Sequence, residues 1–370
     1  MRAAQAEVER ATPDATSHLA ARGPQTGFYR AAWDGLQISS IGLGTYLGEP
    51  DPATDAHYVA AVRRYLQLGG NLIDSAINYR FQRSERSVGA ALQAALAAGE
   101  ASRAEVVLCT KGGYLSFDGE WPADPDAWVQ ATFIDSGLVQ PDEIVDGHCM
   151  APAYLRHQIA HSRENLQSAC IDLYYLHNPE GQRAAVGEAE FDRRLREAFA
   201  ALEVAVAQGH IGAYGTATWN GYRVAPEAPD YLSLERVVSA ARDVSGDRHH
   251  LRTIQLPLNL QMLEALTRPN QPSVAGLVPL LQAAADHGLT VITSAPMLQA
   301  RLLGRLPELL RAKFPAGLSD AHRALQFARS APGVTTALAG MSQTAHVDEN
   351  LQLRSLQPMT SVEFAGMFQP

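Results

Sequence analysis

The sequence contains only three cysteines, Cys109, Cys149 and Cys170, and none of them forms a Cys-x-x-Cys motif. This scarcity argues against a disulfide framework and against a structural zinc site, and we expect no metal. No stretch approaches 18 uninterrupted apolar residues, so no segment is expected to span a bilayer. Residues 1–18 include acidic residues and have no apolar core, which is not typical of a secretion signal. We therefore expect a cytoplasmic protein.

Positive charge is also scarce, because 30 Lys and Arg stand against 39 Asp and Glu, for a net charge of −9. With no long basic run, neither a nucleic acid nor an anionic membrane is an expected partner. Hydrophobic residues make up 46% of the chain, which is typical of a globular protein. Only Lys111 and Lys313 are lysines, and every other basic residue is an arginine. A lysine in an apolar strand of this chain therefore needs a specific reason.

Short apolar segments alternate with helical segments along the chain. Strands are predicted over 41–44, 71–74, 106–110, 172–176, 211–216, 253–256, 290–293 and 334–339. Helices are predicted over 54–68, 85–98, 152–168, 191–208, 234–244, 274–287, 319–330 and 344–351. This alternation indicates parallel strands, in either an open doubly wound sheet or a closed barrel. Eight units, without a glycine-rich fingerprint after the first strand, favour an α/β fold of the (β/α)8 TIM-barrel type.

The barrel is expected to cover residues 28–355, between a flexible N-terminal extension (1–27) and a C-terminal tail (356–370). An Asp34-Gly35 pair between two short apolar segments predicts a β-hairpin at its start. The connection 113–151 is long enough to be a lid-like insertion. It contains Trp121 and Trp128, and disordered segments avoid tryptophan, so we expect an ordered loop. We predict that Trp121, Trp128 and Tyr46 contact the substrate.

Polar residues at the ends of three predicted strands are the candidates for chemistry. Asp74 and Lys111 end the second and third strands, His177 ends the fourth, and Tyr79 follows Asp74 by five residues. Each also has a plain alternative. Asp74 could cap the next helix, Tyr79 could be a packed aromatic, His177 a hydrogen-bonded strand-end histidine, and Lys111 a loop lysine. In a barrel, however, all four lie at the mouth where active sites are built.

Together these four residues form a coherent acid–base set. An ammonium at Lys111 would stabilise a phenolate at Tyr79 and lower its pKa from about 10, while the Asp74 carboxylate would keep the buried lysine charged. A neutral imidazole at His177 could donate a hydrogen bond to a substrate oxygen. The set contains no nucleophile and no metal cluster. It therefore suits proton transfer to a carbonyl oxygen while another group delivers hydride.

These segments resemble the motifs of the aldo-keto reductase family. The run 71–79, with Ser84, Glu85 and Gly89, is similar to the family's Asp-x-Ala-x-x-Tyr segment. The runs 109–111 and 172–179 resemble its strand-three lysine and strand-four histidine, 255–259 its Gln-x-x-x-Asn, and Glu349-Asn350 its last cofactor-binding helix. The resemblance spans residues 28 to 355 and implies a barrel that binds NADPH or NADH without a metal.

The same resemblance implies roles for individual residues. Tyr79 would be the proton donor, tuned by Lys111 and Asp74, and His177 would position the carbonyl of a small-molecule substrate. The cofactor would contact Gly44, Thr45, Thr218, Gln255, Pro296, Met297, Leu298, Arg301, Gly340, Met341, Ser342, His346, Glu349 and Asn350.

The chain departs from the family pattern where the cofactor is expected. Ser294 stands where many members have an aromatic residue, and Ala217 offers no side-chain hydrogen bond. Gly340 and His346 replace a frequent lysine and arginine, which predicts a weak preference for NADPH over NADH. Arg301 could bind a phosphate, or it could lie on a solvated helix face.

We consider three functions. The leading one is an NAD(P)H-dependent oxidoreductase that interconverts a carbonyl and an alcohol. The second is a non-catalytic nucleotide-binding barrel with a regulatory or scaffold role, and the complete acid–base set argues against it. The third is a barrel with another chemistry, such as a sugar isomerase or a metal-dependent hydrolase, for which the strand ends offer too few ligands.

Overall fold

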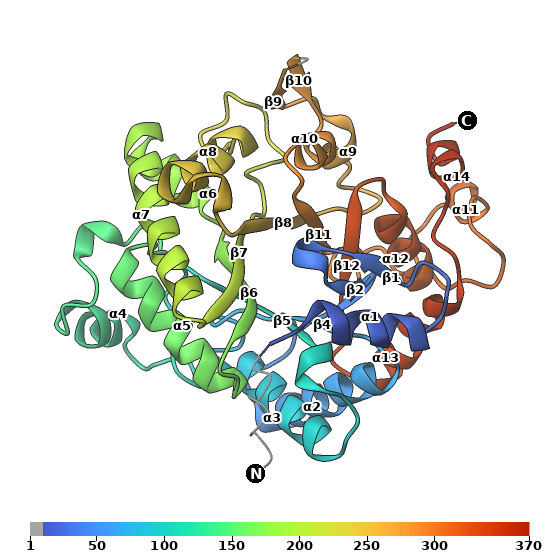
Figure 1. Cartoon of the computed structure of the whole chain (residues 1–370), viewed down its shortest axis with the longest axis horizontal. Coiled ribbons are helices and arrows are strands. Elements are labelled where there is room, and N and C mark those ends of the chain that lie inside the picture. The colour runs from blue at the N-terminus through green and yellow to red at the C-terminus, as the bar shows by residue number, and fades with distance from the viewer. Residues whose placement is uncertain (1–9, 275, 370) are drawn as a thin grey trace, which may run out of the picture.

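Eight parallel strands form a closed barrel, in the order β11-β12-β3-β4-β5-β6-β7-β8. The computed structural model describes residues 10–274 and 276–369. The barrel strands are β3 (Ile41–Gly44), β4 (Leu72–Asp74), β5 (Val107–Gly112), β6 (Ile171–His177), β7 (Ile211–Ala217), β8 (Leu251–Pro257), β11 (Thr290–Ser294) and β12 (Val334–Gly340). Figure 1 shows the strands in the centre with helices around them. The predicted (β/α)8 barrel is confirmed.

The helices that connect the barrel strands cover its outside (Figure 1). They are α2 (Pro52–Gln67), α3 (Arg83–Ala97), α5 (Pro152–Leu166), α7 (Glu188–Ala207), α8 (Leu234–Ser245), α10 (Leu280–Asp286), α12 (Asp320–Ser330) and α13 (Thr344–Asn350). β5 and β6 are buried along their whole length. Strands that are buried on both faces read as continuous apolar runs, which is why the sequence located them within one or two residues.

The bottom of the barrel is closed by the predicted hairpin. β1 (Tyr29–Ala31) pairs antiparallel with β2 (Gln37–Ser39), across a turn in which Gly35 has φ +82°. The side chains of Trp33 and Ile38 are buried in one cluster with Leu72 and Val107 of the barrel strands. The hairpin therefore supplies the lower end of the barrel core.

The prediction of a flexible extension over residues 1–27 is wrong for part of this segment. Residues 13–22 form helix α1 (Pro13–Arg22), which begins at Thr12, whose hydroxyl accepts a hydrogen bond from the Ala15 N–H (3.2 Å). The Ala11 N–H donates to the buried Asp172 carboxylate (2.6 Å). A helix cap and a buried bond to the barrel hold this segment in place. Residues 1–9 lie outside the described residues.

The sixth connecting helix begins later than predicted. The expected helix 274–287 is instead a hairpin of β9 (Gln271–Ser273) and β10 (Gly276–Val278), followed by α10. Pro279 directly precedes α10, and a proline disfavours helical geometry in the residue before it. The helix therefore cannot extend back through Val278.

The remaining elements are short additions outside the barrel. They are α4 (Pro125–Val129), α6 (Glu180–Val186), α9 (Glu264–Thr267), α11 (Glu308–Arg311) and α14 (Ser361–Gly366). α14 lies in the predicted tail, where Phe364 stacks on Phe327 of α12, with ring centroids 5.1 Å apart. Over residues 10–274 and 276–369, no helix is both long and apolar enough to cross a membrane.

Candidate active site

A cavity of about 610 Å³ opens at the carboxyl ends of the barrel strands. Most of the residues predicted to form the site line it. They are Gly44, Thr45, Tyr46, Asp74, Tyr79, His177, Thr218, Gln255, Pro296, Met297, Gly340, Ser342, His346, Glu349 and Asn350. The lining residues come from the ends of β4 and β6 and from the segments after β11 and β12, so the cavity lies at the barrel mouth, where active sites of this fold are built.

Lys111 and Asp74 form a buried ion pair at the cavity wall, which Asp74 lines. The Lys111 ammonium donates to an oxygen of the Asp74 carboxylate and to the Ser75 carbonyl (2.8 Å). The other Asp74 oxygen accepts from the Gln255 amide (2.9 Å). Burial alone would lower the pKa of Lys111, but Asp74 and then Tyr79 offset this, and the pKa lies above its ordinary value. The lysine is therefore held charged by the carboxylate, as expected.

Tyr79 lies against this ion pair and faces the cavity. The Lys111 ammonium is 5.0 Å from the centroid of the Tyr79 ring. Burial raises the pKa of Tyr79 above its ordinary value of 10.0, and Lys111 opposes this rise without reversing it. The sequence predicted the direction of the lysine's effect but not the larger opposing effect of burial. The phenol is consequently protonated throughout the neutral range.

His177 completes the predicted set on the other side of Tyr79. The two rings are 5.9 Å apart and nearly perpendicular (77°). Burial, and next the charge of Lys111, lower the pKa of His177 well below its ordinary value. Its Nδ1 atom is buried with no hydrogen-bond partner among the described residues. The ring is therefore neutral and can donate a single hydrogen bond toward the cavity.

The insertion 113–151 contributes two residues that contact His177. Tyr114 packs edge-on against His177 (5.2 Å, 88°), and the His148 Nε2–H donates to the His177 carbonyl (2.7 Å). Burial lowers the pKa of His148 to about 4, so that ring is neutral and its Nε2–H is the donor. A side chain at Gly113 would meet His148 Nε2 at 2.4 Å, so this close approach requires glycine.

Of the three residues predicted to contact the substrate, one lines the cavity. Tyr46 lines the cavity and lies 5.0 Å from the Tyr79 ring. Trp121 and Trp128 do not line it. Trp121 is 64% exposed and packs on Phe117, while Trp128 packs on Phe133 in the insertion's own small core. Their aromatic surfaces stabilise the insertion, because a 39-residue segment needs apolar contacts of its own.

Several lining residues were not among the predicted site residues, and three of them are polar or aromatic residues just beyond a strand end. Tyr114, Asn178 and Trp219 each lie one or two residues after the end of a barrel strand, and all three line the cavity. The Asn178 amide donates to the Tyr114 hydroxyl (3.2 Å). Their position after a strand end was a signal available in the sequence, independent of any motif.

Three of the predicted cofactor residues do not line the cavity. Leu298, Arg301 and Met341 do not line it: Met341 is fully buried, Leu298 packs in a small cluster with Leu302 and Leu306, and Arg301 is exposed. Within the described residues, no lysine or arginine lines the cavity, and Glu349 does. None of the described arginines and lysines therefore stands in the cavity lining, where it could bind a phosphate group.

The turn after β7 is ordered by a buried carboxylate. One oxygen of Glu180 accepts from the backbone N–H groups of Trp219 (2.7 Å) and Asn220 (3.1 Å). Thr218, just before this turn, has a buried hydroxyl with no partner among the described residues. A buried unpaired hydroxyl at a cavity wall is suited to a hydrogen bond with a ligand.

No group of three or more His, Cys, Asp or Glu residues is arranged to hold a metal ion in the described part of the chain. All three cysteines are buried and unpaired. Burial raises the pKa of Cys149 to about 12 and that of Cys170 to about 11, so these thiols are not nucleophiles at neutral pH.

The family model described as the aldo/keto reductase family matches residues 40–241, more than half of the chain. The chain belongs to the aldo/keto reductase family. D-threo-aldose 1-dehydrogenase from Pseudomonas sp is 30% identical over 187 residues, 50% of this chain and 51% of that protein. The match therefore spans about half the length of that relative. An uncharacterized oxidoreductase of Bacillus subtilis (strain 168) is 24% identical over 341 residues, 90% of this chain and 92% of that protein. These relationships place the chain among oxidoreductases.

Solved aldo/keto reductases have the same fold. The holo form of an aldo-keto reductase from Bacillus halodurans superposes with a TM-score of 0.61 at 23% identity, covering 92% of this chain and 94% of that one. An aldo/keto reductase from Klebsiella pneumoniae in complex with NADP and acetate gives a TM-score of 0.63 at 21% identity, with the same coverages.

Proposed function

We propose that this protein is an NAD(P)H-dependent oxidoreductase that interconverts a carbonyl (aldehyde, ketone or sugar) and an alcohol, with Tyr79 as the proton donor. The observation that carries this proposal is the buried network of Asp74, Lys111 and Tyr79 on the wall of a cavity that also contains His177. A sugar substrate is motivated by the name of the relative D-threo-aldose 1-dehydrogenase. A small-molecule substrate is the expected partner.

The residues of the cavity fit a nicotinamide cofactor. The Gln255 amide donates to Asp74, and the unpaired Thr218 hydroxyl belongs to a residue that lines the same cavity, so both residues could hold the nicotinamide carboxamide. Glu349 and Asn350 lie at the other end of the cavity, where they could hold the adenosine. When bound, NADPH or NADH would supply the hydride.

The four acid–base residues then have separate tasks. In reduction, Tyr79 donates its proton to the substrate oxygen, and Lys111 stabilises the phenolate that forms. Asp74 keeps Lys111 charged, and neutral His177 donates a hydrogen bond that orients the carbonyl. Because the pKa of Tyr79 is raised, reduction should be independent of pH through the neutral range and decline only above pH 10. Oxidation, which needs the phenolate, should instead rise with pH.

The test is Tyr79→Phe, with Tyr46→Phe as a matched control. Tyr79→Phe deletes the proton donor alone, so kcat for the NADPH- or NADH-dependent reduction of an aldehyde panel should fall below a few per cent while the cofactor Kd stays nearly unchanged. Tyr46→Phe removes a hydroxyl from a ring of the same cavity and should keep kcat within a few-fold. A Tyr79→Phe variant that retains more than a few per cent of kcat would contradict the assignment.

The same measurements distinguish the alternative of a non-catalytic nucleotide-binding subunit. Such a protein would bind the cofactor and quench its fluorescence, but even the wild type would fail to oxidise the cofactor with any aldehyde of the panel. The complete acid–base network does not favour that outcome.

A further inference from the structure

The residues directly after Tyr79 have an unusual backbone conformation. Arg80, Phe81 and Gln82 have φ values of +48°, +55° and +72°, in the left-handed region, and none of them is glycine. Left-handed geometry is unfavourable for each of these side chains, so surrounding contacts must hold the turn in place. The largest set of such contacts is made by the Arg80 side chain, which is only 2% exposed.

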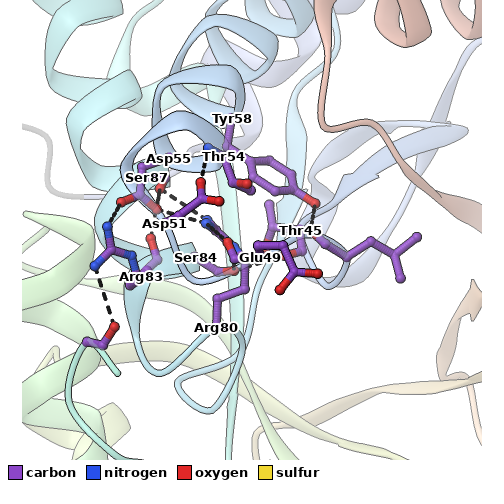
Figure 2. Close-up of polar contacts among 12 residues, drawn as sticks. Thr45, Glu49, Asp51, Thr54, Asp55, Tyr58, Arg80, Arg83, Ser84 and Ser87 are labelled. Atoms are coloured by element: carbon purple, nitrogen blue, oxygen red, sulfur yellow. Dashed lines mark hydrogen bonds and ion pairs between the residues drawn. The ribbon is translucent and has the colours of Figure 1, made fainter. Parts of the chain in front are cut away.

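The Arg80 guanidinium contacts three separate elements (Figure 2). It pairs with Asp55 of α2 through Nη1 (2.8 Å), and it lies over the ring of Tyr58, 4.8 Å from the centroid. Its Nε and Nη2 atoms donate to the hydroxyls of Ser84 (3.1 Å) and Ser87 (3.2 Å) on α3. A guanidinium suits this position because it donates in several fixed directions at once, which an ammonium does not.

The same network reaches the loop after β3, which lines the cavity beside Tyr79. Arg80 Nη1 donates to the Glu49 carbonyl (3.4 Å), and the Ser84 hydroxyl donates to the Thr45 carbonyl (2.9 Å). The Tyr58 hydroxyl donates to the Leu47 carbonyl (2.6 Å). Figure 2 shows Arg80 among the labelled residues of this network, which include Thr45, Glu49, Tyr58 and Ser84. The guanidinium therefore connects the turn that follows Tyr79 to the loop that carries Tyr46.

We propose that Arg80 is a positioning residue, which fixes Tyr79 and the 45–49 loop in their relative places. This inference rests on the proposed function, in which Tyr79 donates the proton. Arg80 does not line the cavity and is buried by α2 and α3, so it acts through Tyr79 and the loop rather than on a substrate. A displacement of about 1 Å at the reacting group lowers a rate by about 100-fold.

The direct test uses Arg80→Lys and Arg80→Gly. Arg80→Lys keeps the charge but loses the guanidinium group with its several donors. Arg80→Gly suits a positive φ but loses every side-chain contact. If the guanidinium positions Tyr79, both variants should lose about 10- to 100-fold in kcat, and KM for the carbonyl substrate should rise because the 45–49 loop moves. The Kd of the cofactor should change less than kcat, because Thr45 is the one residue of this loop among the expected cofactor contacts. Wild-type kcat in both variants would overturn the inference.

Arg103 is the matched control for a merely structural effect. It is also largely buried, it donates to Ser168, Val106, Cys170 and Asp172, and it lies at the opposite end of the barrel. Arg103→Lys should lower the melting temperature and leave kcat and KM unchanged when the assays are run well below both melting temperatures. Equal losses of kcat in the Arg80 and Arg103 variants would show that Arg80 is only structural.

A second, milder pair of variants keeps the inference testable if the Arg80 variants do not fold. Ser84 and Ser87 both accept from Arg80, but only Ser84 also donates to the Thr45 carbonyl. Ser84→Ala should therefore reduce kcat several-fold more than Ser87→Ala, and equal effects would overturn the inference. Failure of the proposed function has a different signature, an active Tyr79→Phe variant. An inactive Tyr79→Phe with fully active Arg80 variants would refute this inference alone.

Discussion

Two ion pairs lie at opposite ends of the same barrel, and they differ in the groups that surround them. At the amino-terminal end, Arg103 pairs with Asp172 (2.9 Å), and both oxygens of Asp172 accept further bonds from the Ala11 and Leu108 N–H groups (2.6 and 2.8 Å). At the carboxyl end, Lys111 pairs with Asp74 and donates once more, to Ser75, beside the Tyr79 ring. One pair is closed by backbone groups, and the other borders a cavity.

This difference suggests why a chain that uses arginine for almost every cation has a lysine at position 111. A guanidinium with several fixed donors is suited to joining several carbonyl groups, which is what Arg103 does. A compact ammonium can contact a carboxylate and a phenol within one confined site. We interpret the Arg103–Asp172 pair at the amino-terminal end (the lower pair) as structural. We interpret the Lys111–Asp74 pair at the carboxyl end (the upper pair) as functional.

The largest expected effect that separates the two pairs is on stability. Asp172→Asn would place an amide NH2 against at least one N–H donor, because both carboxylate oxygens now accept, and breaking one partner of a buried pair costs about 3 kcal/mol. We expect the free energy of unfolding, measured in urea, to fall by about this amount. The kcat at low temperature should match that of the wild type. A loss of kcat in the folded variant would show that the lower pair also affects the site.

The opposite result, a loss of kcat rather than of stability, is expected for Lys111→Arg, which conserves the charge. The guanidinium cannot replace the ammonium between Asp74 and Tyr79 without displacing one of them, so kcat should fall at least ~100-fold, the lower end of a general-acid contribution. Stopped-flow and steady-state assays on one carbonyl substrate, with the melting temperature as a control, measure this. If kcat falls less than tenfold, the comparison between the two pairs is wrong.

The sequence predicted the upper pair better than its surroundings. Asp74, Lys111 and His177 end strands whose apolar runs are unmistakable, and their meeting at one mouth follows from parallel strands. The Arg80 network could not be predicted in this way, because it depends on three successive positive φ values that propensity disfavours. The absence of Trp121 and Trp128 from the cavity lining has a related reason: composition shows that a loop is ordered, but not which face its aromatic side chains cover.

A smaller effect is expected at the end of the cavity lined by Glu349 and Asn350, where the expected change concerns the affinity for the cofactor. No lysine or arginine lines the cavity within the described residues, and by the family resemblance Gly340 and His346 would stand near a 2′-phosphate, which needs charge-assisted bonds. The Kd values for NADPH and NADH should therefore differ by less than about tenfold in fluorescence titrations, equivalent to about 1.4 kcal/mol. A preference of several hundredfold for NADPH would reveal an unrecognised cation, and Arg301→Ala would test whether it is Arg301.

The smallest effect is expected for Lys313→Arg, the same substitution at the chain's second lysine. Lys313 is partly exposed and donates to the carbonyl groups of Gly366, the last residue of α14, and of Gln369 beyond it. Carbonyl groups at a helix end accept from any cation that reaches them, and an arginine has a longer side chain with more donors. The variant should therefore keep wild-type kcat and KM, and its melting temperature should change by no more than a degree or two, which differential scanning calorimetry would measure. Because the chemical change is identical to Lys111→Arg, a silent Lys313→Arg would attribute the loss at position 111 to its surroundings. If both variants lost activity alike, Lys111 would be an ordinary cation and the upper pair would have no special role.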